Sequence, residues 1–155
     1  MPMILVLIGC GDRASLKTLG VDDVEISGVY LGMSEEEVTA HLGEPHTREV
    51  TPEFTGYNYR GLTVAFRSGG LQIDSPRVVD SIYTTSSDYC LLSDICPSDT
   101  LSSIRKTLGP AESETATNDE PKRLFYPLPE LEACWLWILT EDKETASEIS
   151  LVCEP

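Results

Sequence analysis

Alternating apolar and polar positions in the middle of the chain predict an antiparallel sheet with one covered face. Within residues 62–67 the large apolar side chains are Leu62, Val64 and Phe66, and small or polar residues stand between them. This period of two is typical of a strand that buries one side. Similar patterns bounded by turn residues predict strands over residues 46–50, 56–60, 62–67, 78–84, 123–126, 133–140 and 146–153.

Residues 34–42 instead predict a short helix, with signals at both ends. Ser34 and Glu37 form a capping box, in which each side chain satisfies a backbone N–H of the first turn. Val38 and Leu42 lie one turn apart and make the buried stripe. Gly43 supplies the residue after the last turn that adopts a positive φ.

The helix pattern recurs, weakened, 66 residues later. The shift places Thr100 on Ser34, Ile104 on Val38, Leu108 on Leu42 and Gly109 on Gly43. A second helix is expected over residues 100–108, and residues 112–119 between it and the next strand are expected to have low order. We therefore expect an α+β fold of two tandem repeats, each a helix plus an antiparallel meander, over residues 26–88 and 89–155, either as two units or packed as one domain.

Residues 32–45 read Gly-Met-Ser-x-x-x-Val-x-x-x-Leu-Gly-x-Pro. This motif resembles the helix of the SmpA/OmlA (BamE-like) outer-membrane lipoprotein family, and the tandem arrangement is similar to the beta-lactamase inhibitory protein (BLIP) architecture. The resemblance covers the first helix well and the second weakly. It implies a non-catalytic envelope protein that binds other proteins.

The N-terminus predicts a lipid anchor. Residues 3–9 are apolar but too few to span a bilayer, and they end in Leu7-Ile8-Gly9-Cys10. This sequence is typical of a lipobox, with residues 1–9 as the signal segment, Cys10 as the lipidated residue and residues 10–25 as a tether. Gly11 after the cysteine favours the periplasmic side of a bacterial outer membrane. The alternative is a buried first strand, which the polar residues that follow disfavour.

The other four cysteines suit two disulfides in an oxidising compartment. If the last hairpin turns between residues 143 and 144, Cys134 faces Cys153, and apolar residues two and four positions further along each strand pair on the same face. We therefore predict a Cys134–Cys153 bond, and a Cys90–Cys96 bond for the remaining pair.

The net charge of the chain indicates which class of partner it binds. The chain has 11 basic and 26 acidic residues, a net charge of −15. Nucleic acid is an unlikely partner, because its binding depends on neutralising phosphates with Lys and Arg. A cationic protein, or a cationic patch on one, is the expected partner, although acidity also keeps a secreted protein soluble.

The sequence contains no pattern that predicts catalysis or a cofactor. It has no Gly-x-Ser-x-Gly elbow, no Gly-rich phosphate loop and no His-Glu-x-x-His. The two histidines, His41 and His46, are five residues apart, and no cysteines have Cys-x-x-Cys spacing, so a metal site is not expected. We therefore expect a protein that is not an enzyme and needs no cofactor.

Four large aromatic residues are the candidate protein-binding side chains: Tyr57, Tyr59, Trp135 and Trp137. The tyrosines alternate with polar residues, so they could instead point into the core. The tryptophans share one side of their strand, which is either open to water or covered by something that the sequence does not reveal. Two functions fit: an assembly or scaffolding lipoprotein, or an inhibitor or immunity protein that blocks a cationic enzyme or toxin.

Overall fold

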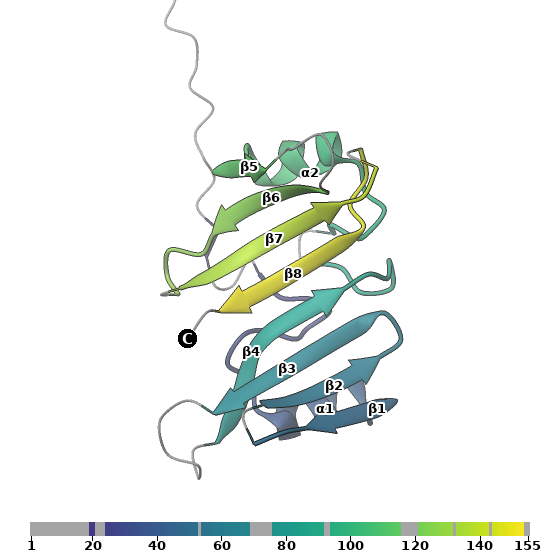
Figure 1. Cartoon of the computed structure of the whole chain (residues 1–155), viewed down its shortest axis with the longest axis vertical. Coiled ribbons are helices and arrows are strands. Elements are labelled where there is room, and N and C mark those ends of the chain that lie inside the picture. Colours follow the sequence, from purple (N-terminus) through teal and green to yellow (C-terminus); the bar gives the residue numbers. More distant parts are fainter. Residues whose placement is uncertain are drawn as a thin grey trace, which may run out of the picture.

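The computed structural model describes residues 19–20, 24–52, 54–68, 76–91, 94–115, 121–131, 133–142 and 144–153. In chain order the elements are α1 (Glu35–Leu42), β1 (Thr47–Val50), β2 (Phe54–Tyr59), β3 (Leu62–Ser68), β4 (Arg77–Thr84), α2 (Leu101–Leu108), β5 (Ser113–Thr115), β6 (Lys122–Pro127), β7 (Cys134–Thr140) and β8 (Glu148–Cys153) (Figure 1).

Both predicted helices are confirmed, together with their caps. At α1 the amide of Glu37 donates to the Ser34 hydroxyl at 3.2 Å, and the amide of Ser34 donates to the Glu37 carboxylate at 2.8 Å. Thr100 caps α2 in the same way, by accepting from the amide of Ser103. Each helix ends at a glycine with a positive φ, 81° at Gly43 and 85° at Gly109, a conformation that costs glycine little.

The predicted α+β fold of two tandem helix-plus-meander repeats is wrong. The eight strands of the described residues form one antiparallel sheet in the order β1-β2-β3-β4-β8-β7-β6-β5, so this part of the chain is mostly β with two short helices (Figure 1). The reason is the pairing of β4 with β8, where Ile82 lies opposite Leu151. This seam satisfies the backbone groups that would otherwise leave two exposed sheet edges in the middle of the molecule.

The strand register shows that both helices cover the same face of the sheet. One row of paired residues crosses six strands, and every member is at most 3% exposed: Tyr57, Val64, Ile82, Leu151, Leu136 and Tyr126. At one end of the row the Tyr57 hydroxyl donates to Glu35 of α1, and at the other end the Tyr126 hydroxyl donates to the carbonyl of Gly109 after α2. The core therefore lies between this face and the helices, and neither α1 nor α2 lies on the opposite face (Figure 1).

Two other expectations need correction. The segment expected to have low order contains β5, whose three residues are all exposed and pair with β6 at the edge of the sheet. Leu19 and Val24 are each only 2% exposed and belong to the core, although they fall within the predicted tether. Both side chains are apolar, so removing them from water stabilises the folded state.

The register predicted for the last hairpin is confirmed. Cys134 pairs with Cys153 across β7 and β8, and the two form a disulfide with their Cα atoms 4.0 Å apart. Because the period of a strand is two, this pairing places Trp135 and Trp137 on the face opposite the core.

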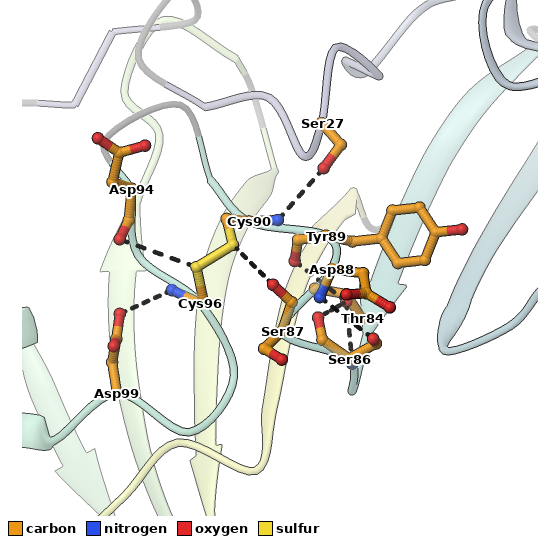
Figure 2. The surroundings of a disulfide bond; sticks show 10 residues. All are labelled: Ser27, Thr84, Ser86, Ser87, Asp88, Tyr89, Cys90, Asp94, Cys96 and Asp99. Atoms are coloured by element: carbon orange, nitrogen blue, oxygen red, sulfur yellow. Dashed lines mark hydrogen bonds between the residues drawn. A yellow bond between two sulfur atoms is a disulfide. The ribbon is translucent and has the colours of Figure 1, made fainter.

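The second predicted disulfide, Cys90–Cys96, is also present and closes a loop of the connector between β4 and α2 (Figure 2). The amide of Cys90 donates to the Ser27 hydroxyl, and the amide of Cys96 donates to the Asp99 carboxylate at 2.8 Å. The bond therefore lies where the connector contacts the segment that precedes α1.

Candidate protein-binding face

The face of the sheet opposite the helices, here called the open face, carries mostly apolar and aromatic side chains across β6, β7, β8 and β4. Strand pairing arranges its side chains in rows. The first row is Arg123, Leu139 and Glu148; the second is Phe125, Trp137, Ser150 and Tyr83; the third is Pro127, Trp135, Val152 and Ser81. Each row joins residues far apart in the sequence.

Three aromatic side chains form a cluster on the open face. The ring of Phe125 lies 5.3 Å from that of Trp137, edge to face, and 6.0 Å from that of Trp135. The guanidinium of Arg123 lies 5.8 Å from the centre of the Trp137 ring, a favourable cation–π distance. Both tryptophans remain partly exposed, so the cluster presents large, rigid aromatic surface to solvent.

Two pockets hollow this face and meet. One, of about 210 Å³, is lined by Tyr83, Arg123, Trp137, Leu139, Glu148, Ser150 and Val152. The other, of about 500 Å³, is lined by Tyr59, Gly61, Leu62, Thr63, Tyr83, Thr85 and Glu148. Tyr83 and Glu148 line both pockets, so the two adjoin, and the second extends to Tyr59 and Leu62 at the β2–β3 end of the sheet. Together the two pockets are called the groove.

The acidic side chain in the lining of this groove is Glu148, and further carboxylates are exposed in the turn before β8. The carboxylate of Glu148 accepts a hydrogen bond from the Ser150 hydroxyl at 2.6 Å. In the turn that precedes β8, Glu141, Asp142 and Glu144 are exposed. Hydrogen bonds from the hydroxyl and amide of Thr145 and from the amide of Glu144 lower the pKa of the Asp142 carboxyl to about 2, so it is charged at physiological pH.

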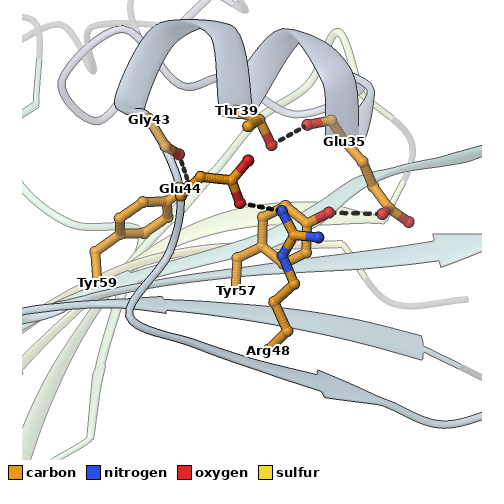
Figure 3. A network of polar contacts seen from close by, with 7 residues as sticks. All are labelled: Glu35, Thr39, Gly43, Glu44, Arg48, Tyr57 and Tyr59. Carbon is orange, nitrogen blue, oxygen red and sulfur yellow. Dashed lines mark hydrogen bonds and ion pairs between the residues drawn. The ribbon is translucent and has the colours of Figure 1, made fainter.

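Tyr57 and Tyr59 do not join the tryptophans. Tyr57 is 3% exposed, lies on the core face and donates its hydroxyl to Glu35 at 2.8 Å, under the guanidinium of Arg48 (Figure 3). Burial, and then this hydrogen bond, raise the pKa of the Tyr57 hydroxyl. The Tyr59 hydroxyl donates to the carbonyl of Gly43 at the end of α1. Both tyrosine hydroxyls bind α1 or the residue after it, and Tyr59 also lines the second pocket. Of the four predicted binding residues, only the two tryptophans lie together on the open face.

Sequence reasoning missed three side chains that complete the open face: Phe125, Arg123 and Tyr83. Residues 123–126 do alternate, and pairing them with β7 places Phe125 beside Trp137. The sequence does not reveal the register between β6 and β7. No cysteine pair or short turn fixes it, whereas both fix the register of the last hairpin.

In the described part of the chain, no group of three or more His, Cys, Asp or Glu residues is placed to hold a metal ion. His41 instead lies against Gly28, with its Nε2 atom 2.9 Å from the carbonyl oxygen of Ser27. Within the same residues, neither helix is long and apolar enough to cross a membrane. Cys10 and the predicted signal segment lie outside the described residues.

Comparison with known proteins finds similar structures but no similar sequence family. No protein-family profile and no curated protein matches the chain. The structure is similar to that of an extracellular protein containing a SCP domain from Bacillus anthracis str. Ames, with a TM-score of 0.53 and 13% identity over 97% of this chain and 50% of that one. A DUF4309 family protein, YjgB from Bacillus subtilis subsp. subtilis str. 168, gives a TM-score of 0.47 with 16% identity over 78% of each chain.

This chain thus spans half the length of the Bacillus anthracis protein. At such low identity the likeness shows a shared fold alone. Nothing in this comparison tests the resemblance of residues 32–45 to the outer-membrane lipoprotein family, which stays a prediction.

Proposed function

We propose that this chain is a non-catalytic, lipid-anchored protein of the periplasmic side of the outer membrane, and that it binds another envelope protein through its open face. The observation that carries the proposal is the cluster of Phe125, Trp135 and Trp137 on a sheet face that neither helix covers. Aromatic side chains in such positions supply most of the energy at many protein interfaces. A buried core position would have given the tryptophans a packing role instead.

Charge supports the class of partner. The chain carries 26 acidic against 11 basic residues, and the carboxylate of Glu148 lines the groove on the open face. A partner with a basic surface is attracted over distance and held in one orientation. The same face would serve an inhibitor or immunity protein if that partner were a cationic enzyme or toxin.

Photo-cross-linking in cells tests the binding face. With p-benzoyl-phenylalanine at Leu139, which lines the groove, ultraviolet light should give a discrete adduct with one partner. The same probe at Glu36, which is exposed on α1, should not, because that helix is on the other face. A third variant with the probe at Thr47 samples the far edge of the sheet.

Equal adducts at Leu139 and Glu36, or none at Leu139 in a correctly localised protein, would remove the open face as a binding site. The identity of the adduct then decides between an assembly component and an enzyme or toxin.

Fractionation tests the anchor. Cys10→Ala should move the protein from the membrane to the soluble envelope fraction, because the diacylglycerol has no thiol to join. Ser15→Ala, a small change in the same segment, should leave it in the membrane. If Cys10→Ala fractionates like the unchanged chain, residues 1–9 are not a lipoprotein signal.

A further inference from the structure

The groove on the open face has the dimensions of a site for an extended chain. It runs from Arg123 on β6 to Thr63 on β3, crossing β7, β8 and β4. Neighbouring strands are about 4.8 Å apart, so four intervals span about 19 Å. An extended segment of about six residues covers this distance.

The lining of the groove changes from apolar to charged along its length. Trp137, Leu139 and Val152 make its floor apolar beneath the first pocket. Glu148 lines both pockets and supplies a carboxylate between them. Arg123 supplies the opposite charge at the β6 end, where it is held over the Trp137 ring.

Among the described residues, neither Glu148 nor Arg123 belongs to an ion pair. The ion pairs there are Arg48–Glu44, Arg67–Asp80, Arg105–Glu114 and Lys122–Glu114. A complementary segment can therefore pair with Glu148 without first breaking a salt bridge there.

We propose that this groove binds an extended, basic segment of the partner protein. An apolar side chain of the segment lies on Trp137, Leu139 and Val152, and a neighbouring Lys or Arg pairs with Glu148. A second copy of this chain is a poorer occupant, because two molecules that each carry a net charge of −15 repel one another. The inference rests on the proposed function and specifies which part of the partner is recognised.

Selection from a peptide library tests this inference. A phage-displayed library of random dodecapeptides is panned on the full chain, and enriched sequences are synthesised with a fluorescent label. We expect enriched sequences to carry Lys or Arg beside an aromatic or aliphatic residue. For peptides without tryptophan, binding should also change the intrinsic fluorescence, because Trp135 and Trp137 are the chain's two tryptophans and both lie on this face.

Matched variants locate the contact. Glu148→Gln should weaken binding about tenfold, because a charge-assisted hydrogen bond is lost. Glu49→Gln makes the same change on β1, in the row of the open face that continues through Gly56, and should have no effect. Trp137→Ala should weaken binding about thirtyfold or more, and Leu139→Ala serves in its place if Trp137→Ala fails to fold by its thermal midpoint.

Several results would overturn the inference: enriched peptides without basic residues, equal loss in Glu148→Gln and Glu49→Gln, or unchanged binding to both groove variants. If no peptide is enriched and soluble peptidoglycan fragments change the tryptophan fluorescence instead, the groove holds a glycan. If panning fails but the probe at Leu139 cross-links a partner, the extended-segment inference falls and the proposed function stands.

Discussion

Ile82→Ala is expected to lower the free energy of unfolding by about 2–5 kcal/mol, the range for truncating a fully buried Ile or Leu. Ile82 is 0% exposed and lies opposite Leu151 in the seam between β4 and β8. Since this seam joins the first four strands to the last four, the loss should affect the whole sheet. Thermal or urea unfolding should therefore shift as one cooperative transition.

Val50→Ala is the matched control. Val50 is also an aliphatic residue in a strand, but it is 67% exposed at the edge of the sheet. Its truncation should change the free energy of unfolding by no more than about 0.5 kcal/mol. Two separate transitions for Ile82→Ala, with one unshifted, would mean that the two halves fold as independent units.

Removing the Cys134–Cys153 disulfide should cost about 2–4 kcal/mol, because the cross-link restricts the unfolded chain between positions 19 residues apart. The double variant Cys134→Ser, Cys153→Ser leaves the backbone pairing of β7 and β8 in place. Its lower urea midpoint should therefore come mainly from the higher conformational entropy of the unfolded chain.

The comparison is Cys90→Ser, Cys96→Ser, whose bond closes only six residues. The shorter loop should make this loss smaller by about 1 kcal/mol. The opposite order would mean that the connector loop of Figure 2 stabilises the molecule more than the hairpin does. Peptide mapping without reductant verifies the pairing in the unchanged chain.

Sequence determined the features that depend on near neighbours. Both helices begin and end as predicted, because a capping hydroxyl and a terminal glycine act within a few residues of the helix that they bound. At α1 the Glu37 carboxylate completes the capping box. The register of β7 and β8 followed from two cysteines and the period of a strand. β5 went unseen because its three exposed residues carry no apolar pattern.

The tertiary structure alone decided which faces meet and which stay open. No local signal indicates that β4 pairs with β8, because Ile82 and Leu151 are equally apolar whether they close two sheets or join one. Alternation shows that Tyr57 shares a side of its strand with Tyr59, but only the packing of α1 makes that side the core. The groove likewise arises from rows that unite Arg123, Trp137 and Glu148, side chains brought together by pairing between strands rather than by their order in the chain.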